Sequence, residues 1–272
     1  MPAIIEFPTL VQDAVEQFGA IFANEPERRH FAEYLTGLLM AEKKTVSGIN
    51  AEFAQTTDQS CLNRWITEVD WDVVKLNEQR LAWLQESPQT RYAPSGVMPI
   101  DNPLVDHSGK LIEDVGYFWD HAEQRYKIAH DYRIVNYVCP SGKHYAIDCR
   151  RFRKRADCEA QQARLAAQPG GVAAATEEDQ RLATFKSHTA LCCELVDEVV
   201  AHQIPGTFAF DSYFTTAPIC THIAQQERAY GGDLKGNRKV WLRGLELRAD
   251  DMAAQIPVED RKKVTLGERT QW

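Results

Sequence analysis

The sequence predicts an α/β (α+β) protein, with a helical N-terminal region followed by a mixed β-sheet that is flanked by helices. Three observations support this fold class. Residues from about 9 to 90 carry apolar side chains at helical spacing. Residues 97–150 contain short apolar strands that alternate with turns. A long helical stretch then separates them from another apolar strand at 207–210.

Composition is that of a soluble globular protein. The chain has 272 residues, of which 44% are hydrophobic and 26% charged, enough for one or two domains. No apolar run approaches the ~20 residues of a membrane span. The N-terminus lacks the features of a signal peptide. The seven cysteines are scattered, so we expect reduced thiols and a cytoplasmic location.

The net charge of −8 argues mildly against a nucleic-acid-binding protein. Positive charge is nevertheless concentrated in two places, and DNA affinity depends on where cations meet phosphates. For each zone the alternative is an ordinary solvated surface. The first zone is the run Arg150–Arg155, and the second comprises Lys235, Arg238, Lys239, Arg243 and Arg248.

The N-terminal region, residues 1–90, is predicted to be a set of short helices. Asp58 and Asp72 are placed to cap two of them. Such an array is compatible with a helix-turn-helix DNA-binding module, but a plain helical bundle fits equally well because the region is acidic. A linker with two prolines and a glycine follows at 87–96. The helices are expected at about 31–39, 45–53, 58–66 and 72–84.

The remainder, residues 97–272, is predicted to follow the order β-β-β-α-β-α. A Gly-rich break at 169–171 separates two helices, the second running from Glu177 through Ala201. A helix is expected at 215–230, after the strand at 207–210. The earlier strands are expected at 97–101, 115–119, 132–138 and 144–149.

Two aspartates end apolar strands that lie far apart in the sequence. Asp101 follows the run 97–100, and Asp211 follows the run 207–210. An aspartate in this position is either a turn cap or a metal ligand. Phosphoryl-transfer sites use such carboxylates to hold two Mg²⁺ ions roughly 3.5–4 Å apart. We therefore take Asp101 and Asp211 as candidate ligands.

Three segments together resemble the DDE transposases of bacterial insertion sequences: IDNPLVDHSGK, GYFWDHAEQRYKIAHDYRIVNY and FAFDSYF. The resemblance implies a ribonuclease H-like catalytic domain over 97–272, whose acidic triad binds Mg²⁺ (or Mn²⁺) and cuts and rejoins DNA ends. It assigns catalysis and metal binding to Asp101 and Asp211. Here the family's Asp-x-Thr motif reads Asp101-Asn102-Pro103, and the proline also removes a backbone N–H.

The third member of the triad is missing from the expected position. The family's glutamate lies in a Tyr-x-x-Arg-x-x-x-Glu signature, which does not occur between 215 and 272. We therefore expect a C-terminally truncated transposase with little strand cleavage. The alternatives are a non-catalytic DNA-binding remnant that pairs with or inhibits a full-length transposase, and a stand-alone nuclease. Candidates by charge alone are Glu227, Glu246, Glu259 and Glu268.

The resemblance also implies partners. Transposon ends and target DNA are the expected substrates, a homodimer is expected in the DNA complex, and no membrane is involved. Phosphate contacts would come from Lys235, Asn237, Arg238 and Lys239.

Two further groups have metal-ligand chemistry, although a structural role is the favoured interpretation of both. Asp120-His121 and His130-Asp131 are acid–histidine pairs. His188 and Cys192 are four residues apart on a predicted helix, a spacing that zinc can use.

Overall fold

The computed structural model describes residues 4–55, 58–109, 112–242, 244–260, 264–266 and 269–271. The chain forms two compact units, Met1–Arg91 and Tyr92–Trp272. None of the helices in the described ranges is both long and apolar enough to span a membrane.

The N-terminal unit is helical, as predicted. Each capping side chain accepts a hydrogen bond from a backbone N–H in the first turn, including Asp58 from Ser60 and Asp72 from Lys75. A 3₁₀ turn, η1 (Gly19–Ile21), joins the first two helices. The α-helices are α1 (Thr9–Phe18), α2 (Glu25–Met40), α3 (Val46–Glu52), α4 (Gln59–Glu68) and α5 (Val73–Leu84).

An aromatic core holds this unit together. Phe22, Ile49, Leu62 and Trp65 are almost completely buried in it. Trp71 stacks on Trp65 with 5.7 Å between ring centroids. The core explains why short helices are stable here, since isolated helices of this length are marginal in water.

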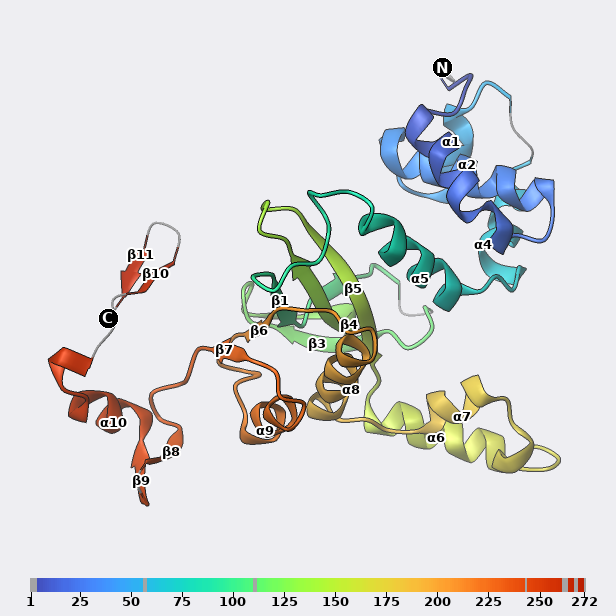
Figure 1. Cartoon of the computed structure of the whole chain (residues 1–272). Helices are drawn as coiled ribbons and strands as arrows, with labels where there is room; N and C mark the ends of the chain where they lie inside the picture. Colours follow the sequence, from blue (N-terminus) through green and yellow to red (C-terminus); the bar gives the residue numbers. More distant parts are fainter. Residues whose placement is uncertain are drawn as a thin grey trace. The chain divides into compact units, whose positions relative to one another are not determined.

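A mixed sheet forms the centre of the second unit (Figure 1). Strand β1 (Val97–Asp101) lies between β4 (Arg125–Val138), which is antiparallel to it, and β6 (Thr207–Phe210), which is parallel. Strand β7 (Tyr230–Gly232) extends the parallel side, and β5 (His144–Phe152) pairs with the other edge of β4. The order β5-β4-β1-β6-β7 is a ribonuclease H-like arrangement, as predicted.

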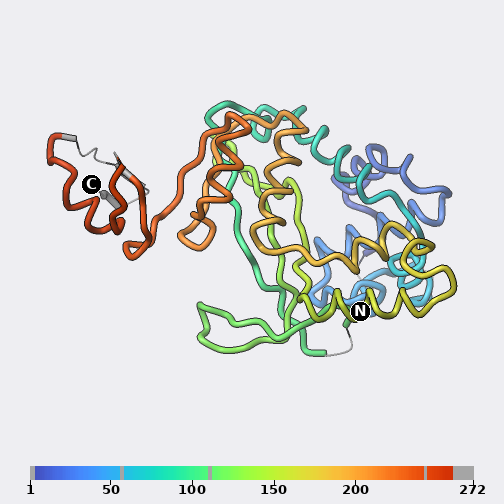
Figure 2. The backbone as a smooth tube through the Cα atoms, turned by 90° about the horizontal axis from the view of Figure 1, so that it is seen from below, coloured from blue at the N-terminus to red at the C-terminus, as the bar shows by residue number. Residues whose placement is uncertain are grey.

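Strand β4 is longer than predicted, because it begins at Arg125 rather than at Tyr132. Its first half forms a hairpin with β3 (Gly116–Asp120), visible in green in Figure 2. Strand β2 (Leu104–Asp106) pairs with its middle. Residues 125–128 alternate polar and apolar side chains, a short strand pattern that the prediction did not use, and pairing with β3 stabilises this half of β4.

The helix predicted from Glu177 through Ala201 is two helices, so that expectation was wrong. Helix α7 (Glu177–Ala183) ends before Thr184, and α8 (His188–Ala201) begins after Ser187, whose hydroxyl accepts from the N–H of Ala190. The N-cap at Ser187 starts a new helix. The preceding helix is α6 (Arg155–Ala166), followed by the 3₁₀ turn η2 (Val172–Ala174).

Helix α8 packs against β4 and β5, and α9 (Ala217–Gln225) packs against α8. Leu191, Cys192, Leu195, Val196 and Val199 form the buried face of α8. The C-terminal part contains β8 (Lys239–Leu242), β9 (Leu245–Arg248), α10 (Ala249–Gln255), η3 (Val258–Asp260), β10 (Val264–Leu266) and β11 (Arg269–Gln271).

Candidate active site

Asp101 and Asp211 lie at the same edge of the sheet. Strands β1 and β6 are parallel, and the last pair in their register is Ile100 with Phe210. Each aspartate directly follows a member of that pair. Neighbouring strands are about 4.8 Å apart, so the register brings the two carboxylates together at the C-terminal ends of β1 and β6.

One oxygen of each carboxylate holds the turn that follows its strand. Oδ1 of Asp101 accepts from the N–H of Asn102 at 2.8 Å. Oδ1 of Asp211 accepts from the N–H groups of Tyr213 and Phe214, at 2.9 and 3.2 Å. Both residues are exposed. The two interpretations of a strand-end aspartate are therefore compatible, because Oδ1 caps the turn while Oδ2 remains available.

The pair suits one divalent cation better than two. Carboxylate oxygens are the ligands that Mg²⁺ prefers, with water completing its octahedral shell. Within the described ranges no three His, Cys, Asp or Glu side chains are grouped so as to hold a metal ion. Among those residues, neither the acid–histidine pairs nor the His188/Cys192 pair forms such a group.

A family model described as DDE superfamily endonuclease matches residues 17–268. The chain belongs to this family. Membership supports a nuclease- or transposase-like function, with DNA as substrate and a divalent metal as cofactor. Comparison with curated proteins gave no match.

Of the glutamates considered for the third position of the DDE triad, Glu227 lies away from Asp101 and Asp211. Helix α9 runs back from the edge that carries Asp211, so Glu227, beyond its C-terminus, lies towards the opposite edge, next to the start of β7. Glu246 pairs with Lys239 at 3.1 Å. Glu259 is exposed in η3, and Glu268 lies outside the described residues.

Asp233 is a carboxylate that the sequence interpretation missed. Gly232 ends β7 and pairs with Phe210, so Asp233 follows at the same edge as Asp211. The signal was another strand ending in aspartate. It was hidden because Tyr230-Gly231-Gly232 contains two glycines, which are depleted in strands.

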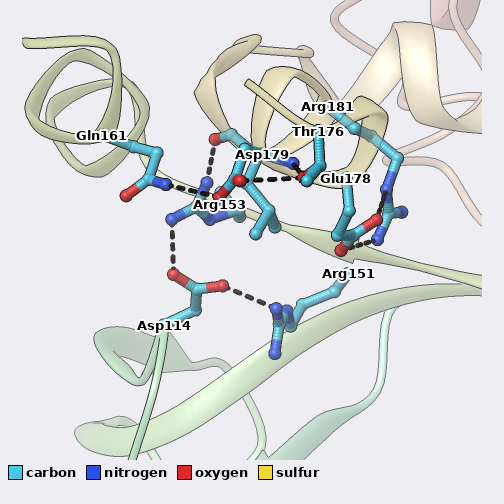
Figure 3. Close-up of polar contacts among 9 residues, drawn as sticks. Asp114, Arg151, Arg153, Gln161, Thr176, Glu178, Asp179 and Arg181 are labelled. Atoms are coloured by element: carbon cyan, nitrogen blue, oxygen red, sulfur yellow. Dashed lines mark hydrogen bonds and ion pairs between the residues drawn. The ribbon is translucent and has the colours of Figure 1, made fainter. Parts of the chain in front are cut away.

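The first basic zone is largely engaged within the protein (Figure 3). Arg151 and Arg153 each bind Asp114, at 2.6 Å, and the Asp114 side chain is only 6% exposed. Arg153 also donates to the backbone carbonyl of Leu182. Arg150 pairs with Asp148 and, at 3.5 Å, with Glu198. These contacts give the run a structural role.

The second basic zone is more open, and one member approaches the site. Lys235 and Asn237 are exposed between β7 and β8, and Lys239 is exposed although it pairs with Glu246. Arg238 donates to the carbonyl of Ser212, the residue after Asp211, at 3.4 Å. Arg243 lies outside the described residues.

Proposed function

We propose that this chain is the transposase of a bacterial insertion sequence, acting by Mg²⁺- or Mn²⁺-dependent strand cleavage and strand transfer at the element's ends. The observation that supports this best is the position of Asp101 and Asp211 at the C-terminal ends of two adjacent parallel strands, in a chain of the DDE family. Water attacks a phosphodiester first, and the freed 3′-hydroxyl then attacks target DNA.

The chain's own groups prepare the site. Asp101 and Asp211 would hold the cation through their free Oδ2 atoms, while backbone N–H groups fix each Oδ1. When bound, the cation would act as a Lewis acid on the phosphoryl oxygens. Lys235, Asn237, Arg238 and Lys239 would contact phosphates and set the register of the DNA.

We infer that catalysis by this chain is incomplete. Since no three-ligand group occurs among the described residues, two carboxylates would bind the cation weakly and strand cleavage would be slow. The same observation favours one alternative: a non-catalytic DNA-binding remnant that pairs with or inhibits a full-length transposase. Such a remnant needs no metal.

Strand transfer joins two element ends to one target, so we also propose that two copies act together on DNA. Light scattering on mixtures of the chain with DNA would report a complex with the mass of two chains. A complex with the mass of one chain would rule this out.

Calorimetric titration with Mn²⁺ and Mg²⁺ tests the metal site directly. The wild-type chain should bind one ion, and Asp211→Asn should weaken binding at least ~10-fold. Replacing a residue that only hydrogen-bonds to a metal ligand already costs about that much affinity, and replacing a ligand itself costs more. Asp120→Asn is a matched control, since Asp120 pairs with Lys127 at 2.7 Å and is away from the site.

Equal affinities for wild type and Asp211→Asn would show that the two-carboxylate site is wrong. Absence of any cation binding by wild type, combined with retained DNA binding, would favour the remnant.

A further inference from the structure

A cavity of about 300 Å³ opens at the turn that follows Asp211, at the lower end of the ~300–1,000 Å³ range of small-molecule sites. Its walls are the first residues of α8, the first residues of α9, the turn after Asp211, and Arg238. Tyr213 and Phe214, whose N–H groups hold the Asp211 carboxylate, also line it. The cavity and the carboxylate therefore share one turn.

His188, which lines the cavity, has a fixed tautomer. Its Nδ1 is hydrogen-bonded to a guanidinium nitrogen of Arg133. A guanidinium only donates, so Nδ1 accepts and the neutral ring carries its proton on Nε2. Burial, followed by the charge of Arg133, lowers the pKa of His188 to about 4. His188 therefore offers an N–H donor from Nε2 at neutral pH.

A buried network holds His188 in place. The Arg133 side chain is 1% exposed and binds both oxygens of Asp131, with 3.1 Å from Nη2 to Oδ2. The rings of Phe152 and Phe214 lie 5.7 and 5.9 Å from its guanidinium carbon. The His188 ring stacks on Phe152 at 3.9 Å between centroids. A ring fixed on two sides is suited to positioning a ligand.

The other polar groups of the cavity are also able to donate. Thr216 Oγ1 is a buried atom with no hydrogen-bond partner among the described residues. A buried hydroxyl without a partner is unfavourable unless a ligand or water satisfies it. Arg238 keeps guanidinium N–H groups beyond the one that contacts Ser212. Tyr213, 43% exposed, adds an aromatic face next to His188.

Donors and a cation beside an exposed aromatic ring are the chemistry that binds a nucleotide: the donors take the phosphate and the ring stacks on the base. We propose that this cavity binds one nucleotide of a DNA strand, with its phosphate on Arg238, His188 and Thr216 and its base against Tyr213. This role rests on the proposed function and adds to it a site that holds the reacting strand beside Asp211.

The test measures nucleotide binding by the full chain without metal, in EDTA. Thymidine 5′-monophosphate and a short single-stranded oligonucleotide are the probes, and thymidine is the probe that lacks the phosphate. Arg238→Gln should weaken both phosphate-bearing probes by at least ~10-fold, the size of a charge-assisted hydrogen bond. Thr216→Val, which keeps the shape, should weaken them ~3- to 10-fold.

His188→Asn removes the Nε2–H donor to the nucleotide and keeps an acceptor for Arg133. The Asn oxygen still accepts from Arg133, while the Nε2 donor is gone, so nucleotide binding should weaken although the Arg133–Asp131 contacts are kept. Lys143→Gln, in the turn between β4 and β5 at the opposite edge of the sheet, is the control and should bind like wild type. The thermal midpoint of each variant checks folding.

Affinities that are unchanged in Arg238→Gln and Thr216→Val, thymidine binding as tight as that of its monophosphate, or no binding by wild type would each overturn the nucleotide site. Tight monophosphate binding with weak oligonucleotide binding would also overturn it, because the site would then serve a free nucleotide. The cation titration is independent: a chain that binds nucleotide in EDTA but no cation keeps this site and loses the proposed metal chemistry.

Discussion

The two strand-end aspartates combine an observed role in a turn with the proposed role as metal ligands. Asp101 and Asp211 each use Oδ1 to close a turn, which fixes the carboxylate plane and leaves Oδ2 pointing away from those N–H groups. An asparagine would keep the turn but lose the charge. Replacement by asparagine therefore separates the cap from the ligand better than alanine does.

His188 gives the protein a pH-dependent stability. Its ordinary pKa is 6.5, and burial and Arg133 lower it to about 4 in the folded chain, against a smaller opposing effect of Asp131. Between these values the unfolded chain binds a proton that the folded chain does not. Stability from this residue is fully present above pH 6.5 and is lost as the pH falls towards 4.

We expect wild type to lose stability faster than His188→Asn over that window, with a difference in slope of at most about 1.4 kcal/mol per pH unit. Thermal melts followed by circular dichroism across the window measure it. Parallel profiles for wild type and His188→Asn would refute the assigned titration.

Among the helices and strands, Asp114 connects the end of β5 to the segment before β3. Its left-handed backbone, with φ 57°, and its buried side chain direct both oxygens at Arg151 and Arg153 near the end of β5. Arg153 in turn reaches the carbonyl of Leu182 in α7. Asp114 thus supports, through Arg153, one of the contacts between the end of β5 and α7 (Figure 3).

Asp114→Asn should loosen that contact. Asparagine tolerates the left-handed backbone, so the change removes mainly the charge that pairs two partly buried guanidinium groups, at a cost of about 1–3 kcal/mol. Hydrogen exchange should become faster in residues 153–183. Glu178→Gln is the matched control, since the Glu178–Arg181 pair is solvent-exposed and such pairs contribute about 0–1 kcal/mol. Unchanged exchange in Asp114→Asn would contradict this role.

Local sequence signals predicted many of the helices and strands. Which strands are neighbours, and which residues line the cavity, depends on contacts between segments far apart in the sequence. Asp58 and Asp72 were recognisable as caps, because capping involves only the next few residues. The apolar runs before Asp101 and Asp211 marked β1 and β6. That β1 and β6 are neighbours is known only from their pairing register, and the pairing of the first half of β4 with β3 is likewise known only from the structure. The cavity brings together α8, α9 and Arg238, which no local pattern reveals.

At the scale of the whole molecule, a net charge of −8 must be reconciled with a DNA substrate. The N-terminal unit has more acidic than basic residues, and the run Arg150–Arg155 is engaged in internal contacts. Exposed cations near the carboxylate edge are instead supplied by the segment between β7 and β8. DNA affinity should then come mainly from the cations of this segment. It should depend steeply on salt, because each neutralised phosphate releases counterions.

The double change Lys235→Gln and Lys239→Gln tests this distribution. Each lost phosphate contact reduces the slope of log affinity against log salt by about 0.9 on duplex DNA, so the slope should fall by up to ~2. Lys143→Gln, at the opposite sheet edge, should leave the slope as in wild type. An unchanged slope in the double variant would place the phosphate contacts elsewhere.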